Sequence, residues 1–545
     1  MKNILLFVSV FLVSVANAQT PFTTHDSINA NNINARIMVH GDMWWDLATQ
    51  QQKCEFPKGS GKHVGFAGAL WLSGYDQSNK LHVAAQTYRQ DGNDYWPGPL
   101  DNSGNLDYAT SAQWAKIWKV TRAEINQYKA TVYHTTSNTP SSILTWPAKG
   151  NAYARGKDSS VLVIERDMAP FVDLNGDGKY QPLKGEYPAI KGEQTLWWVF
   201  SDNGPTHAQS KGDPLKVEVQ AMAYAYKRGT LIDNVVYYDY TLLNRSTKDY
   251  HDFRLAFMED VQIGYYMDEF LAFDSGRRLE ICYNGTNNDG GIAGNPSNSY
   301  GKNPPLTGVT LISQPGDRDA DYIPAGSFMF YNNDLTVIGN PNVDTQYNHY
   351  MRSRYRNGFH IKYDPITNAW GVGSERDYVF VTDPTKPDGW YECSAGNNPG
   401  DRRSVLATND FELKAGGRGR VVMAKVVSVV GGGCPGVSFN GIKEVSDTAW
   451  YNFYNSPVAV TNTAQPQQGL KVYPNPAHNT LIVVNETATD MPITICNMLG
   501  QVMGVYESRR GAEQVIDIGV YAPGVYVVKY INGLSDVGVT RFVKQ

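Results

Sequence analysis

Asp173, Asn175 and Asp177 alternate along one short segment of the chain, and Gly178 follows directly. Calcium-binding loops require side-chain oxygens at positions 1, 3 and 5, with a glycine at position 6 for the tight turn. The spacing therefore predicts a calcium loop that begins at Asp173. The alternative is a turn rich in Asp and Asn that holds no metal.

The second half of this loop departs from the EF-hand pattern. The backbone carbonyl of Lys179 would supply position 7 and Gln181 stands at position 9, but position 12 is Lys184, which cannot bind a cation. We expect Glu186 to supply the bidentate carboxylate instead. Pro182 excludes the helix that follows an EF-hand loop, so we expect a structural calcium site in a β-protein.

A second group of carboxylates occurs later in the chain. Asp260 ends a predicted strand, and Asp268 and Asp274 flank a short predicted loop. These side chains could form a second calcium site, or a pair of carboxylates for glycoside hydrolysis. They could equally be solvated loop charges, because spacing along loops says little about separation in space.

Aromatic side chains could stack on the sugar rings of a glycan ligand. Most of the tryptophans lie in apolar runs, where core packing is the favoured interpretation. Two pairs lie beside Pro and Gly and are predicted to be exposed, namely Tyr95-Trp96 and Trp390-Tyr391.

Nucleophilic chemistry has no clear candidate. The sequence contains no signature of a nucleophilic triad, a zinc hydrolase or a nucleotide-binding loop. The histidines are scattered, and only His207 lies in a polar loop beside Asp202.

Five cysteines imply at least one free thiol or an intermolecular bond. Structural disulfides or buried thiols are favoured over a catalytic cysteine, and Cys282 could pair with Cys393 or Cys434.

The elements that must position these residues are mainly β-strands. Of 545 residues, 12% are aromatic, 51 are Gly and only 19% are charged, which is typical of sheets joined by many turns. The length predicts several β-sandwiches, with an N-terminal β-rich domain at 19–130 and a central β-rich region at 131–455 that holds the calcium loop. Thr121 and Glu124 form a capping box, which predicts a short helix over 123–129. The net charge of −5 does not indicate a basic surface of the kind that binds nucleic acid.

Residues 1–18 have the pattern of a signal peptide. Lys2 precedes an apolar run that is too short to span a bilayer, and Ala16-Asn17-Ala18 supplies the small residues of a cleavage site. We expect cleavage between Ala18 and Gln19. No later segment is apolar for long enough to form a transmembrane helix, so we expect none in the mature protein.

The C-terminal region is a small domain by itself. A polar linker at 456–469 precedes residues 470–545, where roughly seven short strands with turn signals predict an Ig-like β-sandwich. Tyr473-Pro474-Asn475-Pro476, Leu499-Gly500-Gln501, Gly524-Val525-Tyr526 and a basic last strand follow in order. This order resembles the type A C-terminal sorting domain of type IX secretion cargo.

The resemblance implies an export route rather than an activity. Such cargo crosses the inner membrane by its signal peptide and the outer membrane through the type IX translocon. It is then released or held at the cell surface, and its sorting domain is often removed. Adhesins, proteases and glycosidases share this route, so the domain does not indicate what the cargo does.

The central region also resembles a group of uncharacterised secreted β-rich proteins. The resemblance is carried by Gly41-Asp42-Met43-Trp44-Trp45-Asp46, Phe171–Gly178 and Pro399–Arg403. It implies no activity. We therefore expect a secreted or cell-surface protein that is non-enzymatic, is stabilised by calcium and binds a glycan or surface ligand or forms part of an extracellular layer. The alternative is a secreted polysaccharide-active hydrolase that uses the loop carboxylates.

Overall fold

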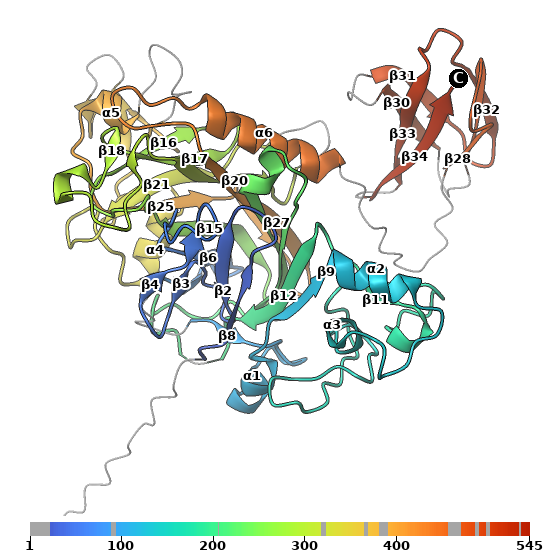
Figure 1. Ribbon diagram of the computed structural model, residues 1–545, viewed down its shortest axis with the longest axis horizontal. Helices are drawn as coiled ribbons and strands as arrows, with labels where there is room; N and C mark the ends of the chain where they lie inside the picture. The colour runs from blue at the N-terminus through green and yellow to red at the C-terminus, as the bar shows by residue number, and fades with distance from the viewer. Residues whose placement is uncertain are drawn as a thin grey trace, which may run out of the picture. The chain divides into compact units, whose positions relative to one another are not determined.

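The structure is a computed structural model that describes residues 22–88, 94–204, 206–317, 323–364, 369–380, 391–455, 470–485, 490–497, 502–532 and 536–545. The predicted signal peptide, its cleavage site at Ala18 and Gln19, and the predicted linker lie outside the described residues. The chain divides into two compact units, residues 1–461 and 462–545. Antiparallel sheets are the main regular structure of each unit, which confirms the prediction of a mainly β fold (Figure 1).

Within the described residues, the first unit contains one sheet of nine strands. In spatial order the strands are β16 (Glu269–Asp274), β17 (Leu279–Asn284), β20 (Leu306–Ser313), β27 (Arg418–Ser428), β14 (Val235–Asn244), β13 (Val217–Ala225), β12 (Gln194–Ser201) and β8 (Trp96–Pro97), and β9 (Trp118–Thr121) pairs with β12. A second sheet of the same unit has six described strands. They are β21 (Ser327–Asn332), β25 (Arg402–Ala407), β15 (Tyr250–Asp260), β6 (Ala67–Asp76) and β7 (Leu81–Ala85), with β26 (Phe411–Leu413) paired to β15.

The predicted domain boundary at residue 130 does not divide the structure. Strands β6 and β7 lie in the same sheet as β15, and β8 and β9 pair with β12. Strands from both sides of residue 130 therefore complete the same two sheets, and residues 19–130 are part of one unit with residues 131–455. The sequence could not show this because strand pairing between distant segments leaves no local pattern.

Alternating side chains of β12 show how the layers pack. Trp198 and Phe200 face the core between the two large sheets, whereas Trp197 and Val199 face a second core on the opposite side of the nine-stranded sheet. Successive side chains of a strand point to opposite faces. Because both faces are covered, the strand is a continuous apolar run rather than an alternating one.

Helices lie mainly outside the sandwich. Their bounds are α1 (Tyr108–Trp114), α2 (Arg122–Ala130), α3 (Ser141–Leu144), α4 (Asp344–Tyr350), α5 (Glu392–Ala395) and α6 (Asn440–Asn455). The capping box at Thr121 is present and begins α2, as predicted. Helix α6 packs on β20 and β27 (Figure 1) and buries Ile442, Val445 and Ala449.

Further short strands form small sheets of two or three strands. They are β1 (His25–Ile28), β2 (Asn34–Met38), β3 (Trp45–Asp46), β4 (Gln51–Gln52), β5 (Cys54–Glu55), β10 (Phe171–Val172), β11 (Tyr187–Pro188), β18 (Asn288–Asp289), β19 (Gly301–Lys302), β22 (Lys362–Asp364), β23 (Ala369–Trp370) and β24 (Ser374–Glu375). The described residues also include the 3₁₀-helices η1 (Pro182–Lys184), η2 (Leu231–Asn234) and η3 (Gly291–Ala293).

The second unit is a β-sandwich with its own core. One sheet contains β28 (Leu470–Tyr473), β29 (Thr480–Asn485) and β32 (Glu513–Asp517), and the other contains β31 (Val502–Ser508), β30 (Met491–Asn497), β33 (Gly524–Asn532) and β34 (Asp536–Lys544). Leu481, Ile495, Ile516, Val528 and Phe542 lie in the core of this unit.

Candidate functional site

The predicted calcium loop closes a two-stranded hairpin. Strand β10 ends at Val172 directly before Asp173, and β11 begins at Tyr187 directly after Glu186. The two strands therefore bring the first and last predicted ligands to the same end of the hairpin. Gly178 has a φ of +72°, a backbone conformation that glycine adopts without a steric penalty.

Backbone N–H groups occupy the predicted ligand oxygens of this loop. Asp173 accepts hydrogen bonds from the amides of Gly176 and Gly178, at 2.7 and 2.8 Å. Glu186 accepts from the amides of Leu174 and Gln181, at 3.2 and 2.7 Å. The loop is thus folded around its carboxylates.

The middle of the loop is held by the side chains of Asn175 and Asp177. Asn175 accepts from the amide of Asp177 at 2.9 Å, and Asp177 accepts from the amide of Lys179 at 2.8 Å. The amide nitrogen of the Gln181 side chain donates to Asp177. These are the contacts of an Asx-rich turn.

The predicted calcium loop carries buried acidic side chains without ion-paired positive charges among the described residues to balance them. Asp173 is 5% exposed and Glu186 is fully buried, and in the described part of the chain no Lys, Arg or His forms an ion pair with either residue or with Asp177. Burial raises the pKa of Glu186, and the charges of Asp173 and Asp177 raise it further. The side-chain oxygen of Gln181 is buried without a hydrogen-bond partner. The oxygen donors suit a hard cation. However, the described residues include no group of three or more His, Cys, Asp and Glu arranged to hold a metal ion.

The second predicted metal site is not assembled. Asp260 pairs with Arg403 at 3.1 Å, and Asp274 pairs with Arg277 at 3.0 Å. Asp268 accepts from the amide of Gly290 at 3.0 Å. Asp268 and Asp274 lie at opposite ends of β16, about 20 Å apart at the rise of a β-strand. The structure therefore corrects the prediction of a second metal site, since the three carboxylates do not converge on one point.

A different set of acids does come together. Asp268, Glu269 and Asp289 are all fully buried, and each accepts hydrogen bonds from backbone amides. Burial raises the pKa of Asp289 to about 6. Because these side chains are closed to solvent, they stabilise the surrounding loops rather than face a substrate.

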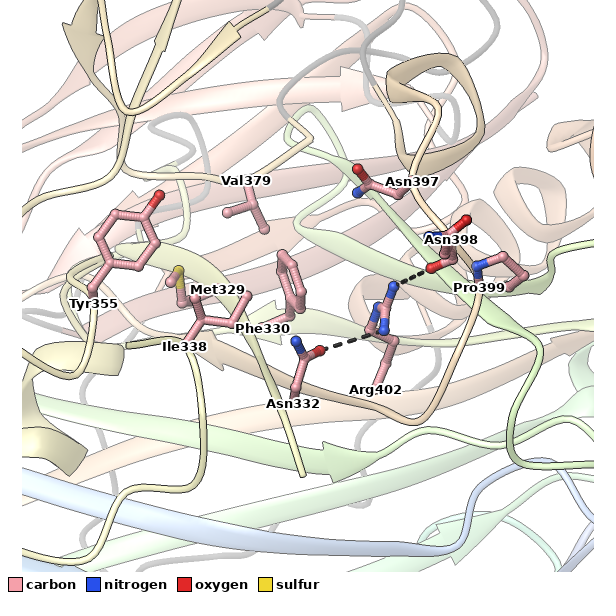
Figure 2. Close-up of a pocket in the computed structure, with 10 residues that line it drawn as sticks. All are labelled: Met329, Phe330, Asn332, Ile338, Tyr355, Val379, Asn397, Asn398, Pro399 and Arg402. Atoms are coloured by element: carbon pink, nitrogen blue, oxygen red, sulfur yellow. Dashed lines mark hydrogen bonds between the residues drawn. The ribbon is translucent and has the colours of Figure 1, made fainter. Parts of the chain in front are cut away.

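A cavity of about 530 Å³ lies beside the six-stranded sheet, and we call it the Asn–Arg pocket. Its described lining residues are Met329, Phe330, Asn332, Ile338, Tyr355, Val379, Asn397, Asn398, Pro399 and Arg402. Figure 2 shows apolar side chains at one end and the amide and guanidinium groups at the other. The described lining includes no Asp or Glu.

Arg402 is fixed in position at the polar end of the pocket. Its guanidinium donates to the Asn398 carbonyl at 2.6 Å and to the Asn332 side chain at 3.4 Å (Figure 2). It also pairs with the buried Glu392 at 3.1 Å and lies 5.6 Å from the centre of the Phe330 ring. Sequence reasoning missed this pocket, because its walls come from segments that are far apart in the chain.

The predicted sorting motif lies at the end of β28 and holds the last strand. The side chain of Asn475 accepts from the amide of Val543 at 2.9 Å, and the amide of Ala477 donates to the Val543 carbonyl at 2.7 Å. The hydroxyl of Tyr473 donates to Glu513 on β32 at 2.8 Å. Pro474 and Pro476 complete the turn, so the motif joins β28 to β34 within the sandwich.

Residues 471–545 match the family model of the secretion system C-terminal sorting domain. The second unit is a type IX sorting domain. Residues 22–455, which we call the cargo, are therefore exported to the outer surface or the medium. The sorting domain implies contact with the type IX machinery. In the described part of the chain, no helix is long and apolar enough to span a membrane.

Comparisons with other proteins leave the activity of the cargo open. No curated protein matches the chain. A polysaccharide lyase is 6% identical with a TM-score of 0.21, over 70% of this chain and 40% of the lyase. The chain thus spans less than half the length of that lyase. A β-glucuronidase from Faecalibacterium prausnitzii is 15% identical with a TM-score of 0.13, over 27% of this chain and 30% of the enzyme.

The type IX surface component PorZ of Porphyromonas gingivalis is 9% identical with a TM-score of 0.12, over 95% of this chain and 75% of PorZ. TM-scores this low establish no common fold with any of the three proteins.

Cysteines in the cargo are structural. Cys393 and Cys434 form a disulfide, so Cys282 pairs with neither. Cys54 and Cys282 are buried thiols. Burial raises the pKa of Cys54 to about 12 and that of Cys282 well above its usual value, so neither is a nucleophile at neutral pH.

Most tryptophans are core residues, as predicted. Trp44, Trp71 and Trp198 are fully buried. The prediction that Tyr95 and Trp96 are exposed is wrong, because they are only 1% and 8% exposed. The second pair predicted to be exposed, Trp390-Tyr391, is only partly described. Trp390 lies outside the described residues, and Tyr391 is partly buried and packs against the core beside α6.

Proposed function

We propose that the cargo is a non-enzymatic ligand-binding protein of the outer cell surface or medium, and that its Asn–Arg pocket binds a carbohydrate. The observation that carries the proposal is the lining of this pocket. One end of the pocket is apolar, and the other presents planar amide and guanidinium groups. The described lining residues include no carboxylate. Two-carboxylate glycoside hydrolysis needs two acids about 5–10 Å apart at the site.

The chemistry of the pocket suits a sugar. Apolar side chains such as Tyr355 and Ile338 can pack on the carbon face of a pyranose ring, while Asn397 and Asn398 can hydrogen-bond its hydroxyl groups. Arg402 is held in place by Glu392, so little side-chain freedom is lost on binding. Because Glu392 balances the charge of Arg402, a neutral sugar fits better than a strongly anionic one.

Calcium is the second part of the proposal. We propose that the loop from Asp173 to Glu186 binds Ca²⁺ through Asp173, Asn175 and Asp177, the carbonyl of Lys179, Gln181 and the carboxylate of Glu186. The support is the excess of buried negative charge in this loop. The ion would neutralise that charge and clamp the hairpin of β10 and β11.

The export route also has finer features that we propose. Residues 1–18 act as a cleaved signal peptide, and the order of Tyr473-Pro474-Asn475-Pro476 and the later motifs assigns the sorting domain to type A. N-terminal sequencing of the secreted protein tests the first assignment. It should begin at Gln19, and any other start contradicts the predicted cleavage site.

Binding and hydrolysis are distinguished by one paired experiment. Purified protein is applied to a glycan array, and the same preparation is screened for release of reducing ends from polysaccharides. We expect binding to a restricted set of neutral glycans without product release. Product release would support the hydrolase, and the absence of both binding and release would contradict the carbohydrate proposal.

Variants assign the binding to the pocket. Asn398→Ala and Tyr355→Ala should each weaken binding about tenfold, which corresponds to the loss of one or two contacts. Asn342→Ala, on the exposed surface outside the pocket lining, is the matched control and should bind as the wild type does. Equal binding by all three variants would place the ligand elsewhere.

A further inference from the structure

Three ionisable side chains meet in the core between the two large sheets of the cargo. Glu259 lies on β15 of the six-stranded sheet, whereas Glu280 and Lys425 lie on β17 and β27 of the nine-stranded sheet. Their exposed fractions are 0% for Glu259 and Lys425 and 1% for Glu280. Isolated charges are too costly to bury at this depth, so the group needs an explanation.

Strand register places Glu280 and Lys425 on the same face. Val309 of β20 is the register partner of Glu280 on one side and of Lys425 on the other. Register partners point to the same side of a sheet. Val309 lies in the core between the two sheets, so both ionisable side chains point toward the six-stranded sheet.

Lys425 contacts Glu259 across this core. Its Nζ donates to Glu259 Oε1 and lies 4.6 Å from the centre of the Trp44 ring. The backbone of Gly65 closes over the pair. A Cβ at Gly65 would lie 3.1 Å from Glu259 Oε1 and 3.6 Å from Lys425 Nζ. The amine of Lys425 and the carboxyl group of Glu259 are thus in direct contact within apolar surroundings.

Glu280 adds a second carboxyl group without a cation of its own. Both of its carboxyl oxygens, and Oε2 of Glu259, have no hydrogen-bond partner of good geometry in the described structure. Burial holds the pKa of Glu280 well above its usual range, and the neighbouring charge of Glu259 raises it further. This favours the protonated form of Glu280, which can both give and take a proton.

We propose that Lys425 and Glu259 condense into an intramolecular amide that cross-links the two sheets, with Glu280 as the proton-transfer residue. A proton first passes from the ammonium of Lys425 to the carboxylate of Glu259, which gives a neutral amine and a neutral acid. The lone pair of Nζ then attacks Cδ of Glu259 and forms the C–N bond.

Glu280 completes the reaction. Its carboxylic acid gives a proton to the hydroxyl that leaves Cδ and takes one from the new nitrogen, so that its own proton count is unchanged. The Cδ–O bond breaks and water departs. An amine and a carboxylic acid become one amide and one water, and nothing is oxidised or reduced. The product removes both buried charges.

Mass spectrometry of the full-length protein tests the proposal. After reduction of the disulfide, the denatured protein should be lighter than its sequence predicts by the mass of one water. Proteolysis should release a branched peptide that joins Lys425 to Glu259. A peptide map decides the question, because cyclisation of an N-terminal Gln would also lower the intact mass. Recovery of Lys425 and Glu259 only in separate linear peptides would overturn the proposal.

Variants assign the roles. Lys425→Arg keeps the positive charge but should give no branched peptide. Glu280→Gln should slow cross-linking about 100-fold or more, because general acid and base catalysis usually contributes at least this factor to a rate. Lys191→Arg is the matched control: the ion pair of Lys191 with Asp239, at 2.8 Å, lies outside this core, and this variant should cross-link normally. If Glu280→Gln cross-links at the wild-type rate, the role of Glu280 is wrong. If that variant does not fold, the wild-type peptide map still decides the cross-link.

Discussion

At the residue scale, His207 shows how the cargo holds charge in its interior. Its Nδ1 and Nε2 lie 3.8 Å from Asp94 and 3.8 Å from Asp202, respectively, and all three side chains are fully buried. The same nitrogens contact the carbonyls of Val83 at 2.8 Å and of Asp202 at 2.5 Å. Carbonyl oxygens only accept hydrogen bonds, so the imidazolium form of the ring, in which both nitrogens donate, satisfies both contacts.

This geometry makes stability depend on pH. Burial lowers the pKa of His207, but the charges of Asp94 and Asp202 together with the carbonyls of Asp202 and Val83 raise it by more, so that it lies above its ordinary value. A raised pKa stabilises the folded protein fully below the unfolded value of about 6.5, and this stabilisation is lost as the pH rises through the folded value. We expect His207→Gln to lower the free energy of unfolding by about 3 kcal/mol at pH 5.5, and by less above pH 8.

Urea unfolding at several pH values measures this difference. His25→Gln is the control, because His25 is exposed. A loss of stability for His207→Gln that is the same at every pH would show that the ring is neutral in the folded protein.

At the scale of single elements, the capping box of α2 gives a direct prediction. Thr121 accepts from the amide of Glu124 at 3.2 Å, and Glu124 accepts from the amide of Thr121 at 2.8 Å. Thr121→Ala should therefore destabilise the cargo by about 1 kcal/mol, measured by denaturant unfolding. Asn126→Ala, at an exposed position of the same helix, should not destabilise it. Equal stability of the wild type and Thr121→Ala would show that α2 frays independently of the core.

The hairpin of β10 and β11 carries the calcium prediction. Calcium at 100 times its dissociation constant should add about 2.7 kcal/mol to the stability, which thermal unfolding with and without a chelator measures. Asp177→Asn keeps the shape of the loop but removes one charge, and it should lose most of this response. Asp158→Asn alters an exposed Asx turn and should retain the response in full. A melting temperature that chelation leaves unchanged would show that the loop is only a turn.

The sequence predicted the elements better than their assembly. Thr121 and Glu124 marked the start of α2. Helix α6 was not predicted, although Ile442, Val445 and Ala449 follow a helical period, because the helix is rich in Asn, Gly, Ser and Thr, which are weak helix formers. The Asn–Arg pocket joins β21 to residues that follow α5, so no local pattern could indicate it. The pairing of Cys393 with Cys434 likewise depends on packing.

At the scale of the whole molecule, the cargo and the sorting domain are separate compact units. Each has its own hydrophobic core. Removal of residues 462–545 should therefore leave the melting temperature of the cargo within about 2 °C of that in the full chain, since the cores of the cargo contain no residue of the sorting domain. Calorimetry measures this, and a large loss of stability would show that the sorting domain also supports the cargo.

The central claim is that an independently folded cargo is delivered by the sorting domain at residues 471–545. Its most direct test is the location of the protein in cells of a type IX secreting bacterium, by fractionation and by protease treatment of intact cells. The full chain should be found at the surface or in the medium, and a chain that ends at residue 461 should accumulate folded in the periplasm. Appearance of the truncated chain at the surface in equal amount would contradict the claim.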